Sequence, residues 1–225
     1  MTSQPPYQSY PPAQAPATDV PPPQQAPEQA AKRSKGLNWL VEIAVTVLLA
    51  FALYWIIQTF VVQTYRVEGE SMDQTLANGQ HLLIDKLTPR FDSYSRGDIV
   101  VLHPPDQQES STPYIKRVIG VAGDHIEVKD DHVWINGTEL TEPYVAPHAK
   151  TVPLTDVDTW DVGRDQVFVM GDNRQHSVDS REFGVVATNE IIGRAWLRFW
   201  PLDSLGLLQV PTYPDLPPAA ASPAP

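Results

Sequence analysis

An uncharged apolar segment near the amino terminus restricts the fold of this chain more than any other feature. From Ile43 to Tyr65 there are 23 consecutive residues without a charged side chain. As an α-helix with a rise of 1.5 Å per residue, this segment would extend about 34 Å, which is enough to cross a hydrocarbon core of about 30 Å. Since the apolar residues begin at Leu37, the sequence predicts a transmembrane helix at 37–62.

A cleaved signal peptide is the alternative, because Ala50-Phe51-Ala52 offers a small-x-small cleavage site. The apolar core of a signal peptide has only about 7–15 residues and lies near the amino terminus. Here the apolar segment continues beyond Ala52 and follows a polar leader of 36 residues, which favours an uncleaved anchor. Lys32, Arg33 and Lys35 precede the segment, so the positive-inside rule predicts a cytoplasmic amino terminus and a single-pass plasma-membrane protein with the rest of the chain outside.

The two ends of the chain are rich in proline. Of the 23 prolines, nine lie within residues 1–31 and six within residues 211–225. Neither end has enough apolar surface to offset the entropy lost on ordering, so we expect a disordered leader at 1–36 and a disordered tail at 211–225. A proline-rich docking site for a cytoplasmic partner is the alternative for the leader.

Charge and cysteine content exclude several classes of protein. The chain has 16 Lys and Arg against 27 Asp and Glu, a net charge of −11, which argues against nucleic-acid binding. It has no cysteine, which excludes disulfides, cysteine-ligated zinc, iron–sulfur clusters and cysteine nucleophiles. The six histidines lack the spacing of metal ligands, and the sequence has neither a Walker loop nor a GxGxxG pattern, so we expect neither a metal nor a cofactor.

The rest of the chain, residues 63–210, is expected to form one extracytoplasmic domain that is mostly antiparallel β. Short β-rich segments alternate with turn signals such as Arg96-Gly97 and Asn136-Gly137, and no long amphipathic helix follows the membrane span. The predicted strands are His81–Leu87, Asp98–Leu102, Tyr114–Val121, His125–Val128, His132–Ile135, Gln166–Met170, Val185–Ala187 and Ile191–Phe199.

Three glycine-bearing stretches contain residues that can perform chemistry. The first, 69–76, places the hydroxyl of Ser71 in a loop shortly after the membrane span. The second, 114–120, contains Lys116 next to Arg117, and on a strand these two side chains point to opposite faces, one inward and one into solvent. An inward lysine has a lowered pKa, because burial disfavours the ammonium ion, and a neutral lysine beside a serine is a general base. The third stretch is Gly-Asp-Asn-Arg at 171–174.

Four sequence boxes behind one amino-terminal span give the chain a family resemblance. The boxes are S-M-x-x-T-L at 71–76, G-D-I-V-V at 97–101, Y-I-K-R-V-I-G-x-x-G-D at 114–124 and G-D-N-R-x-x-S-x-D-S-R at 171–181. In this order they resemble the type I signal peptidases, which are bacterial membrane serine endopeptidases. The resemblance covers residues 37–200 and leaves out both proline-rich ends.

This resemblance implies a role for particular residues. Ser71 would be the nucleophile and Lys116 the general base, with Ser177 hydrogen-bonding the lysine amine. Asp179 and Arg181 would form a supporting ion pair. The same loop would be shaped by Asp172, Asn173 and Arg174, and the substrate groove would be lined by Tyr65, Val67, Met72, Leu76, Tyr114 and Ile115. The implied fold is a β-rich catalytic core with a smaller β extension inserted at 124–165.

Two positions depart from the family pattern. Gln74 stands where the family usually has a proline, which would cost local order in the loop after the nucleophile rather than chemistry. Gly69 stands where some members have a serine that helps bind the oxyanion, so the oxyanion would depend on the Ser71 backbone N–H and another main-chain group or water.

The expected activity is the removal of signal peptides from exported preproteins at the membrane lipid surface, by cleavage after small residues of the A-x-A type. Three alternatives stay open: a Ser–Lys peptidase that acts on itself or on one partner, a Ser-His-Asp hydrolase that uses His176, and an anchored binding protein with an inactive protease fold. The sequence does not indicate an oligomeric state.

Overall fold

The structure is a computed structural model that describes residues 29–87, 89, 91–105 and 112–217. It separates into two units, divided between Ala50 and Phe51. Two predictions lie partly outside the described residues: the disordered leader at 1–36, of which 1–28 is not described, and the tail at 211–225, of which 218–225 is not described.

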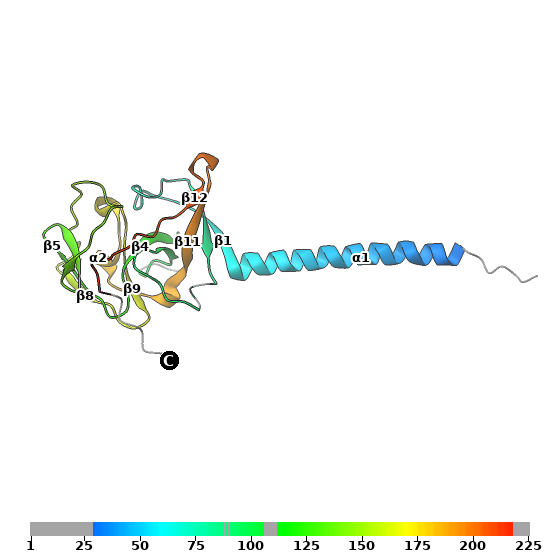
Figure 1. Ribbon diagram of the computed structural model, residues 1–225, viewed down its shortest axis with the longest axis horizontal. Helices are drawn as coiled ribbons and strands as arrows, with labels where there is room; N and C mark the ends of the chain where they lie inside the picture. Colours follow the sequence, from blue (N-terminus) through cyan, green and yellow to red (C-terminus); the bar gives the residue numbers. More distant parts are fainter. Residues whose placement is uncertain (1–28, 88, 90, 106–111, 218–225) are drawn as a thin grey trace, which may run out of the picture. The chain divides into compact units, whose positions relative to one another are not determined.

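The long amino-terminal helix α1 runs from Gln29 to Ile56 (Figure 1). Within it, Asn38–Ile56 is the one span among the described residues that is long and apolar enough to cross a membrane. The helix begins eight residues before the predicted start, because the preceding alanines, lysines and arginine are strong helix formers. It is followed by a π-helical turn, η1 (Ile57–Val61), and then by strand β1 (Val62–Arg66).

The uncharged segment of the sequence is therefore not a helix throughout. Its last residues, from Val62 to Tyr65, form most of β1, where β-branched side chains suit an extended backbone. The predicted helix end at 62 lies one residue after the π-helical turn.

A large sheet of eight antiparallel strands forms the body of the second unit, and the prediction of a mostly antiparallel β fold is confirmed. The strand order is β1-β2-β11-β3-β4-β9-β10, with β12 paired to β11. Besides β1, its strands are β2 (His81–Asp85), β3 (Ile99–Leu102), β4 (Tyr114–Gly120), β9 (Gln166–Met170), β10 (Val186–Ala187), β11 (Ile191–Trp200) and β12 (Gly206–Leu207).

A second sheet has four strands in the order β7-β6-β5-β8. These are β5 (His125–Lys129), β6 (His132–Ile135), β7 (Thr138–Glu139) and β8 (Thr159–Asp161). Within this unit β5 and β8 lie at the end opposite β1 and β12 (Figure 1). The sheet takes up residues 125–161, inside the range in which the resemblance implies a β extension, and the boundaries 124–165 stay a prediction.

The remaining regular elements are short. They are α2 (Ser180–Phe183), η3 (Arg174–His176), η4 (Thr188–Glu190) and η5 (Leu202–Ser204). The absence of a long helix after the membrane span thus holds for the residues that the structure describes. Strands β1, β7, β8 and β12 were not predicted, because the last three have only two or three residues and β1 is part of the apolar segment.

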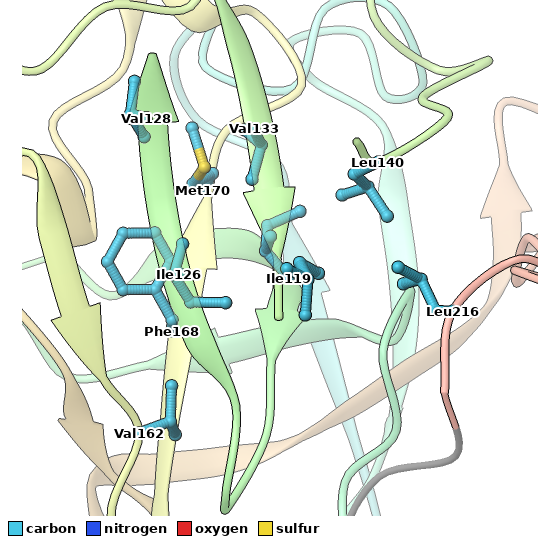
Figure 2. Packing of buried hydrophobic residues seen from close by; sticks show 10 residues of the cluster. Ile119, Ile126, Val128, Val133, Leu140, Val162, Phe168, Met170 and Leu216 are labelled. Atoms are coloured by element: carbon cyan, nitrogen blue, oxygen red, sulfur yellow. The ribbon is translucent and has the colours of Figure 1, made fainter. Parts of the chain in front are cut away.

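Hydrophobic residues of both sheets gather in three buried clusters. One of them joins the small sheet to β4 and β9, with Ile126 and Val133 packed against Ile119 and Phe168 (Figure 2). Leu216, from the carboxyl-terminal segment, also belongs to this cluster and is 9% exposed. The expectation of disorder from residue 211 is therefore wrong for 211–217, because Leu216 adds apolar surface that the core buries.

Candidate active site

Ser71 lies in a turn between β1 and β2. The turn is closed by backbone hydrogen bonds, since the amides of Thr75 and Leu76 both donate to the carbonyl of Met72, at 2.8 and 2.7 Å. The side chains of Met72 and Leu76 are buried at 1% and 0% exposure, which anchors the turn to the large sheet. Ser71 itself is half-buried, so its hydroxyl is presented at the surface of a fixed turn.

Lys116 extends from β4 toward this serine, and its Nζ lies 2.8 Å from Oγ of Ser71. The lysine is only 3% exposed, and Nζ also lies 4.9 Å from the ring centre of Tyr114. Burial lowers the pKa of Lys116 from its ordinary value to about 8, an effect that the carboxylate of Asp179 opposes and the guanidinium of Arg181 supports. A buried amine that loses its proton near neutral pH, placed on a serine hydroxyl, can act as a base for that serine.

Arg117 is also buried, at 1% exposure, and the expectation that one of these two neighbours is solvated is wrong. Strand β4 is buried at every residue from Ile115 to Gly120, so side chains on both of its faces are covered. The charge of Arg117 is compensated by a two-pronged ion pair with Asp172, at 2.8 and 2.7 Å, and by the carbonyl of Gly97 at 2.8 Å. Asp172 and Gly97 therefore satisfy the hydrogen-bond donors of the buried guanidinium.

The loop at 171–174 contacts the backbone around the serine. The amide of Asn173 donates to the carbonyl of Ser71 at 3.0 Å, and its side-chain amide donates to the carbonyl of Glu70 at 3.1 Å. A Cβ at Gly171 would lie 2.5 Å from the carbonyl oxygen of Ser71, so the close approach of loop and turn requires glycine there. Asp172 accepts a hydrogen bond from the hydroxyl of Thr75. This loop therefore holds both ends of the serine turn.

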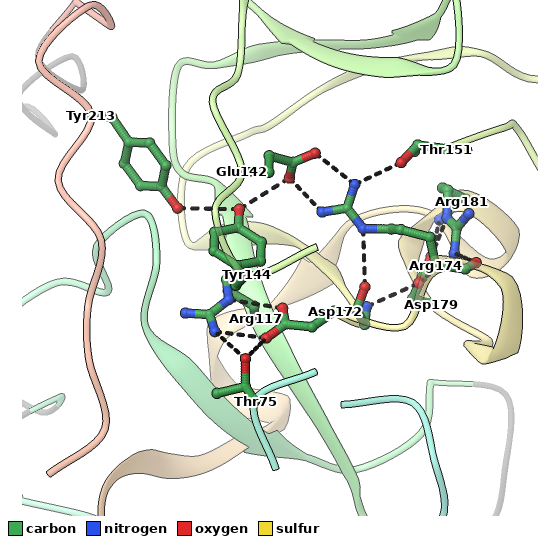
Figure 3. A network of polar contacts seen from close by, with 11 residues as sticks. Thr75, Arg117, Glu142, Tyr144, Thr151, Asp172, Arg174, Asp179, Arg181 and Tyr213 are labelled. Carbon is green, nitrogen blue, oxygen red and sulfur yellow. Dashed lines mark hydrogen bonds and ion pairs between the residues drawn. The ribbon is translucent and has the colours of Figure 1, made fainter. Parts of the chain in front are cut away.

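Asp179 and Arg181 form a fully buried ion pair of 2.9 Å behind the same loop. Asp179 accepts a hydrogen bond from the amide of Gly171 at 3.0 Å, and Arg181 donates to the carbonyl of Arg174 at 2.8 Å. Arg174 in turn donates to the carbonyl of Gly171. It also forms an ion pair with Glu142, which lies in the connection between β7 and β8 (Figure 3). The three charged side chains thus fix the loop from behind.

Ser177 lies close to this group without the bond that the resemblance implies. It is 8% exposed, and Oγ has no hydrogen-bond partner among the described residues. Its side chain lies against Cα of Gly171, where any added Cβ would clash with it. A bond from Ser177 to the amine of Lys116 stays a prediction.

The six residues expected to line the substrate groove separate into two groups. Four are buried together in one cluster beneath the serine turn: Val67, Met72, Leu76 and Ile115. Tyr65 is partly exposed and packs against that cluster, whereas Tyr114 packs against a different one. The four buried members are thus part of one hydrophobic core.

Gly69 and Gln74, the two departures from the family pattern, are both exposed. Gly69 has a φ of +90°, a backbone conformation that a serine side chain would strain, and the space beside it is open. The local backbone therefore favours glycine at this position.

The elements of a Ser-His-Asp site are not assembled here. His176 is exposed, and its Nδ1 lies 3.3 Å from the side-chain oxygen of Asn173. Both neighbouring carboxylates are committed to arginines, Asp172 to Arg117 and Asp179 to Arg181. No group of three or more acidic or histidine residues with metal-binding geometry occurs within the described ranges.

Two residues of the site region have no signal in the sequence by which they could have been predicted. Glu142 and Tyr144 lie about 30 residues before the loop that they support, in a stretch without a motif. The ring of Tyr144 lies 4.0 Å from the guanidinium carbon of Arg117, and its hydroxyl donates to Glu142 at 3.0 Å. Only the folded chain brings them to the site.

Comparison with known proteins matches the chain to one family. The sequence pattern of the family described as "Signal peptidase, peptidase S26" matches residues 40–200. "Signal peptidase I P" of Bacillus subtilis subsp. natto is 37% identical over 185 residues, covering 79% of this chain and 96% of that protein. "Probable signal peptidase I-2" of Synechocystis sp. is 36% identical over 180 residues, covering 79% of this chain and 81% of that protein.

Two further relatives agree with these. "Signal peptidase IB" of Staphylococcus aureus is 33% identical over 181 residues, covering 74% of this chain and 91% of that protein. A crystal structure of a signal peptidase I from Enterococcus faecalis V583 is 30% identical, covers 46% of this chain and 97% of that chain, and superposes with a TM-score of 0.38. At that score the structural likeness adds no argument of its own.

Proposed function

The chain belongs to the signal peptidase family, peptidase S26, and from this premise we propose that Ser71 and Lys116 form its catalytic dyad. Membership makes the protein a serine-type endopeptidase that removes signal peptides. The observation that carries the dyad is the distance of 2.8 Å between Nζ of Lys116 and Oγ of Ser71, at a lysine that is 3% exposed.

The proposed reaction begins with the neutral form of Lys116. Its Nζ accepts the proton of the Ser71 hydroxyl, and Oγ attacks the carbonyl carbon of the scissile peptide bond. When the C–N bond breaks, Nζ returns the proton to the leaving amine, and the substrate carbonyl stays attached to Oγ as an ester. Lys116 then takes a proton from a water molecule, whose oxygen attacks the carbonyl carbon of the ester. The C–Oγ bond breaks, the cleaved peptide leaves with a new carboxyl group, and Nζ returns the proton to Oγ of Ser71.

The negative oxygen formed during each attack needs a hydrogen-bond donor. The main-chain N–H of Ser71 makes no hydrogen bond within the part of the chain that the structure describes, so it is available for this purpose. With glycine at position 69 there is no hydroxyl two residues before the nucleophile, which leaves the remaining stabilisation to another main-chain group or water.

The other residues of the site are proposed to support the dyad. Ser177 would orient the amine of Lys116 with its buried hydroxyl, which has no hydrogen-bond partner among the described residues. The ion pair of Asp179 and Arg181, together with three loop residues, would keep the turn that carries Ser71 at a fixed position relative to Lys116 on β4. Those three residues are Asp172, Asn173 and Arg174.

Cleavage after small residues is the proposed specificity. A substrate that binds as an extended strand places alternate side chains against the protein, so its P1 and P3 residues would face the same surface. The buried cluster that contains Val67, Met72, Leu76 and Ile115 supports this proposal, because a substrate surface above such a filled cluster would leave depth only for small side chains such as alanine.

Anchorage in a membrane is proposed from α1, whose span Asn38–Ile56 is uncharged except for Glu42. Lys32, Arg33 and Lys35 precede the span, so we propose that the amino terminus is cytoplasmic and the peptidase domain extracytoplasmic. In this orientation the enzyme would meet preproteins on the side where their signal peptides leave the membrane.

Replacement of each dyad residue tests the proposal. Ser71→Ala and Lys116→Ala should each abolish cleavage of a preprotein by the full chain in detergent, while Ser93→Ala and Lys150→Ala, both at exposed positions, should leave it unchanged. Mass spectrometry of the products should show a small residue at the new carboxyl terminus. Turnover at the normal rate by either dyad variant would overturn the assignment.

The same assay separates the alternatives. Full activity of His176→Ala would exclude a Ser-His-Asp mechanism, and this is the result that we expect. Cleavage of several unrelated preproteins would exclude a peptidase that processes only itself or one partner. A wild-type chain without turnover would instead indicate a binding protein.

A further inference from the structure

The carboxyl-terminal segment, residues 210–217, lies beyond the family match and packs on the peptidase domain. Leu216 enters the cluster shown in Figure 2. The carbonyl of Pro217 accepts a hydrogen bond of 2.8 Å from Arg96. Pro211 packs on Gly97, where an added Cβ would lie only 2.9 Å from the proline ring. The segment is thus held at three places along its length.

Between Pro211 and Leu216, Tyr213 connects the segment to Tyr144, which lies in the connection between β7 and β8. Its hydroxyl donates to the hydroxyl of Tyr144 at 3.2 Å, and Tyr144 donates to Glu142 at 3.0 Å (Figure 3). Tyr144 covers Arg117, with its ring centre 4.0 Å from the guanidinium carbon. The carbonyl of Gly97, on which Pro211 packs, accepts a hydrogen bond from Arg117.

Arg117 is the point at which these contacts reach the serine turn. Arg117 donates hydrogen bonds to both carboxylate oxygens of Asp172. Asp172 in turn accepts a hydrogen bond from the hydroxyl of Thr75, the fifth residue of the turn that begins at Ser71. A second connection runs from Glu142 through Arg174 to the carbonyl of Gly171, in the loop that binds the backbone of Ser71. Both connections include residues that contact Tyr144 directly.

We propose that Tyr144 and Tyr213 are positioning residues for the nucleophile: the carboxyl-terminal segment holds Tyr144 over Arg117, and Arg117 with Asp172 holds the Ser71 turn against Lys116. Both tyrosines would act on Ser71 through other side chains, namely Arg117, Asp172 and Thr75. A displacement of about 1 Å between a nucleophile and its base costs a large factor in rate, so small changes in this packing should reach the reaction. The inference rests on the proposed Ser71–Lys116 dyad.

The test compares kcat and KM of hydroxyl-deletion variants in the full chain, with a peptide substrate that has alanine at P1 and P3. Tyr213→Phe should lower kcat about fivefold and leave KM within about twofold, because the dyad is misaligned but the substrate surface is intact. Tyr144→Phe should lower kcat at least as much, because it also removes the bond to Glu142. The double variant should equal Tyr144→Phe alone, since the bond that Tyr213→Phe removes is already absent.

A matched control is Tyr94→Phe, whose ring lies beside Arg194 at 5.8 Å, in a different cluster. It should leave kcat unchanged. A normal kcat for Tyr213→Phe, a double variant whose loss is the product of the two single losses, or a change in KM alone would each overturn the proposal.

Hydrogen exchange separates a failure of this inference from a failure of the dyad. In Tyr213→Phe the amides of Thr75, Leu76 and Asn173 should exchange faster, because their hydrogen bonds belong to the turn and loop that the network holds. The same measurement in a Ser71→Ala background needs no activity. Unchanged exchange there would overturn the positioning role, whereas turnover by Ser71→Ala would overturn the dyad.

Discussion

The buried position of Lys116 predicts an unusual pH dependence of cleavage. Only its neutral form can accept a proton, and burial lowers the pKa of Lys116 to about 8. The neutral fraction is then about 1% at pH 6, about 50% at pH 8 and about 90% at pH 9. We therefore expect kcat/KM to rise about fifty-fold from pH 6 to pH 8 and to level off above pH 9.

The cause of the shift makes the prediction sharper. Desolvation is the largest contribution and the nearby charges are buried, so the midpoint should change little between low and high salt. The assay measures initial rates with a peptide that has alanine at P1 and P3, in detergent, in overlapping buffers from pH 6 to pH 10. Lys150→Ala serves as the control, because Lys150 is exposed and paired with Asp131.

An unshifted lysine gives a clearly different curve. With an ordinary pKa of about 10.4, kcat/KM would still rise about sevenfold between pH 9 and pH 10, where the buried lysine predicts almost no change. A continued rise in that range, or a profile that does not depend on pH below 8, would refute the view that Lys116 is a desolvated base.

Three other predictions concern stability and topology. Asp172→Asn should lower the free energy of unfolding by about 3–5 kcal/mol, because it leaves the buried guanidinium of Arg117 without its partner, and thermal unfolding measures this. A stability equal to wild type would contradict the burial of that pair. Leu216→Ala should cost about 2 kcal/mol, or roughly 4–8 °C in Tm, and a variant that melts like wild type would show that this residue does not pack. Since the chain has no cysteine, Ser9→Cys should resist and Thr155→Cys should accept a membrane-impermeant thiol reagent added to intact cells, and the reverse pattern would refute the proposed orientation.

Much of the fold could be predicted from local patterns. The strand Gln166–Met170 matches its predicted bounds, and β4 ends one residue before the predicted end, because turn signals and β-branched residues mark such strands clearly. Strands of two or three residues, such as β7 and β12, leave too short a pattern to recognise. Helix α1 begins at Gln29 because the residues before Leu37 have high helix propensity. Their charges kept them out of the predicted membrane span, so the start of the helix was placed too late.

The candidate site shows a similar division. Ser71 and Lys116 could be singled out from the boxes around them, but the sequence placed one of Lys116 and Arg117 in solvent. Both are buried, because β4 has neighbours on each side and its faces are covered by segments that are distant in the chain. Glu142 and Tyr144 carry no motif, so their contacts with the site could not be anticipated.

By itself the sequence determined what depends on local composition and order: a span of apolar residues, a mostly antiparallel β domain, and the four boxes of a signal peptidase family. Only the tertiary structure decided what depends on distance through space. It places Ser71 2.8 Å from Lys116 across 45 residues of chain, buries Arg117 against Asp172, and brings Tyr213 onto Tyr144. The physical reason is that burial and pairing of a side chain are set by whatever packs over it, and in this protein those partners come from other parts of the sequence.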